Sequence, residues 1–95
     1  MIKLIIIATF YANSFVGKPT ASGEIFSQHR FTCATRMFPL GARLMISNIS
    51  NGRTVEVKVN DRCAKHGIVD LSKVAFKEIS DLKYGRAKVT VVRKN

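Results

Sequence analysis

The stretch that most constrains the fold covers residues 54–72 and reads TVEVKVNDRCAKHGIVDLS. Its first half alternates between polar and apolar residues, which predicts a strand with one buried face carrying Val55, Val57 and Val59. The strand pattern ends at Asp61, where the chain enters a glycine-containing loop. A carboxylate there is held by the strand and reachable from solvent, so Asp61 is a candidate functional residue. The alternative is a turn former that bonds its own backbone.

Further short apolar runs, separated by turn signals, predict a mainly β fold. We expect strands over residues 2–11, 30–35, 43–48, 54–60, 68–70 and 87–92. The pair Asn51-Gly52 predicts a hairpin between two of them. Ser72 is expected to cap a short helix whose apolar side carries Leu71, Val74, Ala75, Ile79 and Leu82. Six short strands with one or two short helices predict a closed barrel, and 95 residues suffice for one domain over residues 1–95.

The chain is strongly basic, with 16 Lys and Arg against 6 Asp and Glu and a net charge of +10. This charge predicts attraction to a polyanion: nucleic acid, an acidic membrane surface or an anionic wall polymer. The alternative is a basic protein without such a partner. The basic residues are scattered and no nucleic-acid-binding motif is present, which argues against a nucleic-acid module. No apolar run approaches the about twenty residues of a membrane span.

The two cysteines, Cys33 and Cys63, fit either one disulfide in an oxidising compartment or two free thiols. They and the two histidines, His29 and His66, lack the spacing of a metal site, so we expect no metal and no cofactor. Residues 1–8 combine one lysine with a short isoleucine-rich run. This pattern is either a short export signal or a buried first strand, and we favour the strand, so no export signal is evident.

Six segments, in order along the chain, resemble the RlpA-like (rare lipoprotein A) family of double-psi β-barrels. They are ATFY at 8–11, KPTASGE at 18–24, FPLGARL at 38–44, ISNISNGR at 46–53, VNDR at 59–62 and IVDLS at 68–72. The family segments read A-S-W-Y, R-x-T-A-S/N-G-E, L-P-F-G-T-x-V, V-T-N-L-x-N-G-R, V-N-D-R and I-I-D-L-S. The resemblance covers residues 8–92 and implies a six-stranded double-psi β-barrel.

The resemblance also implies activity on peptidoglycan. Characterised members are lytic transglycosylases that cut the glycan strand and leave 1,6-anhydro ends, so it implies a secreted, periplasmic or wall-associated enzyme. Its partner would be peptidoglycan or another wall polysaccharide, and we expect a monomer. The alternative is a non-catalytic module, because expansins and barwin-like proteins share the barrel and bind or loosen polysaccharide without this chemistry.

Cleavage of a glycosidic bond needs an acid with a raised pKa. By the resemblance, Asp61 is the candidate acid/base and Glu24 its partner, each within a matching motif. Asp70 precedes the expected helix, and we expect it to help cap that helix. Four further residues in or beside the motifs are expected to bind substrate: Tyr11, Ser22, Thr35 and Arg62.

Two departures from the family pattern favour the non-catalytic alternative. Thr35 stands where the family carries a histidine, and threonine does not titrate in the useful range. Cys33 and Cys63 resemble a cysteine pair of barwin-like proteins, which implies a disulfide that fixes the loop beside Asp61.

Overall fold

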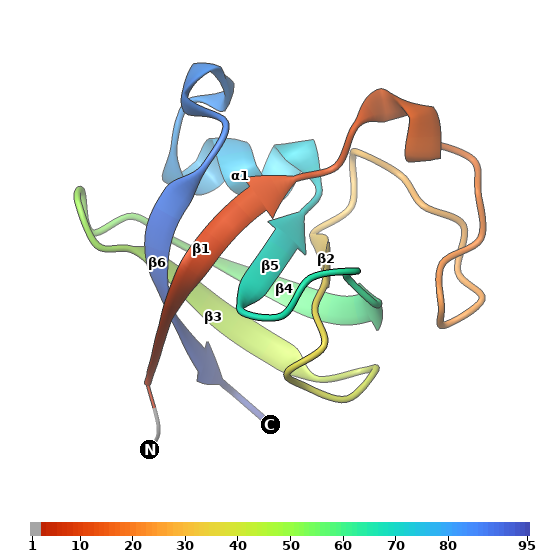
Figure 1. Cartoon of the computed structure of the whole chain (residues 1–95), viewed down its shortest axis with the longest axis horizontal. Coiled ribbons are helices and arrows are strands. Elements are labelled where there is room, and N and C mark those ends of the chain that lie inside the picture. Colours follow the sequence, from red (N-terminus) through yellow and green to blue (C-terminus); the bar gives the residue numbers. More distant parts are fainter. Residues whose placement is uncertain (1–2) are drawn as a thin grey trace.

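A computed structural model of the chain describes residues 3–95, which form a closed six-stranded barrel with three short helical segments (Figure 1). The strands are β1 (Leu4–Phe10), β2 (Thr32–Ala34), β3 (Arg43–Asn48), β4 (Thr54–Asp61), β5 (Ile68–Leu71) and β6 (Ala87–Arg93). The helix is α1 (Lys73–Ile79), and two 3-10 turns are η1 (Asn13–Phe15) and η2 (Leu82–Tyr84). The expected mainly β barrel is confirmed. Residue 2, where we expected the first strand to begin, lies outside the described residues.

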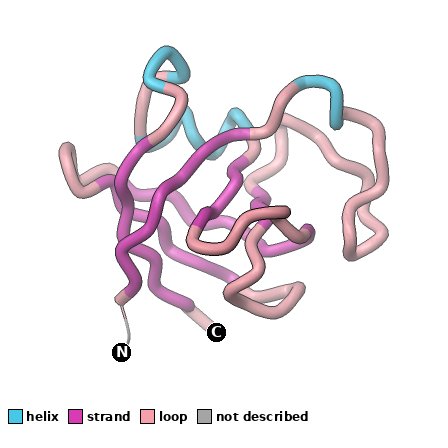
Figure 2. The backbone as a smooth tube through the Cα atoms, in the orientation of Figure 1, coloured by secondary structure: helices cyan, strands magenta, loops and turns pink. Residues whose placement is uncertain are grey.

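The strands do not follow one another around the barrel in chain order. The order is β1-β5-β2-β4-β3-β6, closed by the pairing of β6 with β1. The pairs β1–β5 and β2–β4 are parallel, and the other pairs are antiparallel. Parallel neighbours need long connections, and other strands separate the members of both parallel pairs in the chain. The segment between β1 and β2, which are not paired with each other, is mostly loop and extends to one side of the barrel (Figure 2).

The barrel interior holds the apolar residues that alternation predicted. Val55, Val57 and Val59 are at most 7% exposed. Together with inward residues of the other strands they form one core cluster. Phe76 and Ile79 of α1 are fully buried in this cluster, so the helix lies against the core through its apolar side. None of the helices within residues 3–95 is long and apolar enough to cross a bilayer.

The hairpin between β3 and β4 turns at Asn51-Gly52, as predicted. The amide of Gly52 donates to the carbonyl of Asn48 at 2.9 Å, and the φ of Gly52 is 75°. This left-handed conformation costs glycine little, because it has no Cβ.

The start of α1 differs from the sequence expectation. Ser72 occupies the N-cap position, but its side chain makes no capping hydrogen bond. The Gln28 side chain instead accepts from the amide of Lys73 at 2.8 Å and donates to the carbonyl of Tyr11 at 2.9 Å. The helix also ends at Ile79, so Leu82 belongs to η2. A distant loop therefore supplies the cap and ties the helix to the end of β1.

Candidate active site

The strand register brings Asp61 and Asp70 into one row across the barrel wall. Thr9 of β1 is paired with Asp70 of β5, Asp70 with Ala34 of β2, and Ala34 with Asp61 of β4. The β2–β4 register shifts between Cys33 and Ala34, which makes Asp61 the partner of Ala34. The unusual strand order therefore brings together two carboxylates nine positions apart.

Both carboxylates line one open hollow of about 400 Å³. Thr9 and Tyr11 contribute hydroxyls to its wall, Arg62 and Lys65 contribute positive charge, and Phe15 contributes an aromatic edge. A volume of this order is within the range of small-molecule sites. The hollow combines what a sugar-processing site needs: carboxylates, hydroxyls and an aromatic surface.

Asp61 is held in place by three hydrogen bonds. The hydroxyl of Tyr11 donates to its Oδ2 at 2.7 Å. The amides of Ala21 and Arg62 both donate to Oδ1, each at 2.9 Å. The Ala21 bond attaches the 18–24 loop to the end of β4. Burial raises the pKa of Tyr11, as does its hydrogen bond to Asp61, so this hydroxyl stays a donor at any working pH.

Asp70 is partly buried within a strand, rather than exposed at the start of α1 as a helix-capping role would require. It lies in β5, and its Oδ1 accepts a hydrogen bond from the Thr9 hydroxyl at 2.8 Å. The first turn of α1 holds no acidic residue, so the capping expectation is wrong. Burial raises the pKa of Asp70 above its ordinary value; the hydrogen bond from Thr9 opposes this shift and the negative charge of Asp61 adds to it. The surroundings of Asp70 therefore favour its protonated form.

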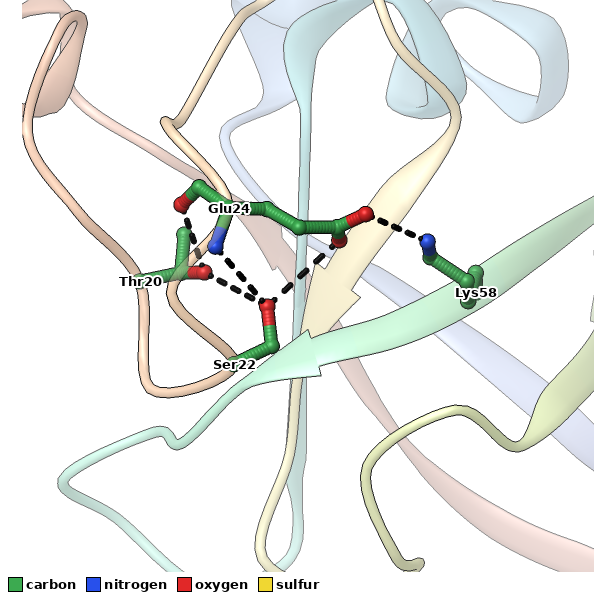
Figure 3. Close-up of polar contacts among 4 residues, drawn as sticks. All are labelled: Thr20, Ser22, Glu24 and Lys58. Atoms are coloured by element: carbon green, nitrogen blue, oxygen red, sulfur yellow. Dashed lines mark hydrogen bonds and ion pairs between the residues drawn. The ribbon is translucent and has the colours of Figure 1, made fainter.

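Glu24 lines a different, smaller hollow from the one that Asp61 lines. Its Oε2 forms an ion pair with Nζ of Lys58 on β4 at 2.7 Å (Figure 3). Its backbone and carboxylate also contact Ser22, whose hydroxyl lies 3.0 Å from that of Thr20. The Lys58 hydrogen bond lowers the pKa of Glu24, so this side chain is a carboxylate. Glu24 thus fixes the loop that donates Ala21 to Asp61, rather than sharing the hollow of Asp61.

The four expected substrate-binding residues lie in different environments. Tyr11 and Arg62 line the hollow. Arg62 also donates to the carbonyls of Thr35 and Phe38, at 2.8 and 2.6 Å. Ser22 is exposed beside Glu24, in the loop that reaches Asp61. Thr35 is fully buried, and its hydroxyl accepts from the amide of Met37 at 3.2 Å.

Comparison with known proteins identifies the family. A family model described as lytic transglycolase matches residues 5–91. The chain belongs to the RlpA-like lytic transglycosylase family. It is 42% identical over 86 residues to a probable endolytic peptidoglycan transglycosylase RlpA of Treponema pallidum, and 39% identical over 87 residues to the endolytic peptidoglycan transglycosylase RlpA of Pasteurella multocida. These alignments cover 88% and 90% of the chain but only 27% and 30% of the relatives, so the chain spans less than a third of their length.

Other relatives differ in length and in what is known of them. An uncharacterised protein of Synechocystis sp. is 40% identical over 86 residues, which are 90% of this chain and 93% of that protein. Among solved structures, the Streptomyces papain inhibitor superposes with a TM-score of 0.79 at 26% identity, over 98% of this chain and 94% of that one. A mutant Clavibacter michiganensis expansin in complex with cellohexaose has a TM-score of 0.78 at 21% identity, over 99% of this chain and 51% of that one. These likenesses confirm the double-psi barrel.

The expected disulfide in this RlpA-like domain is not found, because Cys33 and Cys63 are both free thiols. Cys33 faces the main core, whereas Cys63 contacts a separate cluster with Tyr11, Phe26 and Ala34. Adjacent residues of a strand point to opposite faces, so Cys33 points away from the side of β2 on which Ala34 and Cys63 lie. Burial raises the pKa of the Cys33 thiol to about 12, which makes it unreactive.

Sequence reasoning missed two residues of the hollow, Asp70 as a functional group and Phe15. Phe15 is 47% exposed at the edge of the hollow, and its ring lies edge-to-face on Tyr11 with the centroids 5.6 Å apart. Tyr11 in turn stacks on buried Phe26 at 4.0 Å. The contact with Tyr11 holds Phe15 in place, and Nζ of Lys18 lies 5.8 Å from the centroid of the Phe15 ring. Phe15 lies in a stretch of the sequence without a periodic pattern, so no sequence signal identifies it as a site residue.

Proposed function

We propose that this chain cleaves peptidoglycan glycan strands by lytic transglycosylation at the hollow between Asp61 and Asp70. The observation that carries the proposal is the pair of carboxylates in one sugar-sized hollow, one of them with a raised pKa. The names of the Treponema and Pasteurella relatives support the same reaction. Because peptidoglycan lies outside the cytoplasm, we propose that the protein acts there, at the cell wall, with residues 1–95 as a single domain of a monomer.

In the proposed reaction, the protonated Asp70 donates its proton to the glycosidic oxygen as the bond from that oxygen to C1 breaks. The C6 hydroxyl of the same sugar forms a bond to C1 and transfers its proton to Asp61. The products are a free hydroxyl end and a 1,6-anhydro end, and no water is consumed. A proton passing from Asp61 to Asp70 through solvent restores the starting state.

This assignment gives the proton-donor role to Asp70, because a general acid must keep its proton near the working pH. Asp61, held by three donors, suits the acceptor role. Glu24 acts as a positioning residue through the loop that donates Ala21 to Asp61. The aromatic face of Phe15 stacks on a sugar ring and sets its orientation over the carboxylates.

The direct test is digestion of purified sacculi by the chain, followed by mass spectrometry of the released fragments. We expect fragments that end in 1,6-anhydro sugars. Fragments with reducing ends would show hydrolysis and overturn the lytic mechanism. Binding to sacculi without any released fragment would favour the non-catalytic alternative, which the buried, non-titrating Thr35 supports.

Replacing Phe15 by alanine tests the stacking role. We expect Phe15→Ala to raise KM for glycan about five- to tenfold with little change in kcat, because an aromatic contact is worth about 1 kcal/mol. Phe15→Tyr should restore KM. Phe31→Ala is the matched control, since Phe31 is also exposed, at 44%, but lies outside the hollow. Equal effects of the two alanine variants on KM would contradict a specific role for Phe15.

A further inference from the structure

Three more hollows follow one another along α1 and η2. The first, of about 500 Å³, lies between the 12–30 loop and α1. The second is about 360 Å³ and the third about 470 Å³. Lys77 and Leu82 line both the first and the second, and Ser80 lines both the second and the third. The three hollows are therefore neighbours on one side of the molecule, and we call them together the α1 path.

The α1 path is positively charged. Its walls carry five basic side chains, and the only acidic one among the described residues that line it is Asp81. The basic residues are Arg53, Lys73, Lys77, Arg86 and Lys88. The carboxylate of Asp81 accepts from the amide of Lys83 and caps η2. The path thus carries an excess of four positive charges.

These positive charges are not neutralised within the described part of the chain. The three ion pairs found in residues 3–95 use Glu24 and Glu56, with Lys58, Arg43 and Lys94. Two path cations instead contact neutral acceptors. Nζ of Lys73 donates to Oδ1 of Asn13 at 2.9 Å, and Arg53 donates to the carbonyl of Lys77 at 3.2 Å. Such contacts orient a cation and leave its charge available to a ligand.

The path also carries an exposed aromatic ring. Tyr84 is 64% exposed, and Nζ of Lys83 lies 5.3 Å from its ring centroid. An exposed ring beside cations fits a polymer that offers both sugar faces and anionic groups, whereas a free small anion would not need the ring or a path of three hollows. The length of the path therefore favours an extended polysaccharide.

The α1 path begins beside the hollow that holds Asp61 and Asp70. Phe15 of η1 lines that hollow, and Asn13 and Val16, one on each side of it in sequence, line the first hollow of the path. A polymer that extends over η1 from the carboxylates would reach the path directly.

We propose that the α1 path binds a wall polysaccharide carrying phosphate or carboxylate groups and so places the glycan strand at the Asp61–Asp70 hollow. This inference rests on the proposed function for its choice of polymer. The site itself is distinct from the catalytic hollow and is tested by binding rather than by cleavage.

The experiment compares two charge-reversed variants that change net charge equally. Lys77→Glu with Lys88→Glu alters the path. Lys3→Glu with Arg93→Glu alters exposed residues that lie outside the path, one directly before β1 and one at the end of β6. These strand ends lie away from α1 (Figure 1). Cosedimentation with sacculi is measured over a range of salt concentrations. We expect the path variant to bind about tenfold more weakly and with a smaller salt dependence, and the control to stay within about twofold of the unmodified chain. Equal losses would show that only net charge matters and would overturn the site.

Further arms identify the source of the anionic groups and separate the two proposals. If removing phosphate polymers from the sacculi abolishes the difference between the variants, the path binds phosphate groups. If removing the peptide stems abolishes that difference, the path binds carboxylate groups. A larger loss of binding to duplex DNA than to sacculi in the path variant would overturn the polysaccharide assignment.

A cleavage assay separates this proposal from the proposed function. Cleavage of short uncharged glycans should be unchanged in the path variant. Failure of the proposed function would instead appear as no cleavage by any variant, whatever the binding result.

Discussion

Replacing Asp70 by asparagine is expected to lower kcat for sacculus cleavage by about 10²–10⁴-fold, the range that general acid catalysis contributes. Asparagine cannot transfer a proton to the leaving oxygen. Its amide oxygen can still accept the hydrogen bond that Thr9 donates to Asp70 at 2.8 Å, so the barrel should stay folded. The rate of fragment release from sacculi, measured at saturating substrate, gives kcat.

The pH dependence of the unmodified chain should agree with this role. The pKa of Asp70 is raised, mainly by burial, so the protonated acid persists above the ordinary aspartate range and is lost as pH rises further. Activity should therefore fall on the alkaline side as Asp70 ionises.

Glu78→Gln is the matched control for Asp70→Asn, because Glu78 is exposed on α1 outside the hollow. Full activity in the Asp70→Asn variant would remove Asp70 from the mechanism.

Replacing Phe76 by alanine is expected to lower the free energy of unfolding by about 3–5 kcal/mol. Phe76 is fully buried, and its ring lies edge-to-face on Phe10 with the centroids 5.0 Å apart. Truncation leaves a cavity between α1 and the barrel, which the closed strands cannot fill. Urea denaturation followed by circular dichroism measures the change.

Phe31→Ala is the control for this loss of stability, because Phe31 is 44% exposed. The backbone carbonyl of Phe31 accepts from the amide of Lys58, and the substitution keeps this carbonyl. It should change stability by no more than about 0.5 kcal/mol. A loss below about 1 kcal/mol for Phe76→Ala would mean that α1 contributes little to the core.

Local sequence patterns were sufficient to predict the strands and the hairpin. The alternation of Val55, Val57 and Val59 predicted the inward face of β4, and Asn51-Gly52 predicted the turn before it. These features depend on residues near one another in the chain. The double-psi assignment came from the six family segments, because the strand order β1-β5-β2-β4-β3-β6 leaves no local mark in the sequence.

The candidate site was harder to predict because it depends on that strand order. Asp61 was found from its place at the end of a strand. The position of Asp70, two residues before the N-cap, favours a helix-capping role, and only the pairing of β5 with β1 and β2 shows that it faces Thr9 and the hollow. The motif paired Glu24 with Asp61, and the structure connects them through the Ala21 amide rather than through a shared hollow.

The helix cap and the cysteines illustrate the same limit. Gln28 caps α1 from a loop 45 positions away, a contact that no spacing rule identifies. The resemblance to barwin-like proteins implied a disulfide, but Cys33 lies in the main core and Cys63 packs against a separate cluster, a separation that depends on the tertiary fold.

The proposed mechanism depends most directly on the ionisation of Asp70 next to Asp61. Carbon-13 NMR of the aspartate side-chain carboxyls, followed against pH in the unmodified chain and in Asp61→Asn, measures it. We predict that Asp70 titrates above the ordinary aspartate pKa, and that its pKa falls in Asp61→Asn without reaching the ordinary value, because burial remains when the neighbouring charge is removed. An Asp70 that titrates at or below the ordinary value, or that does not respond to Asp61→Asn, would contradict the account.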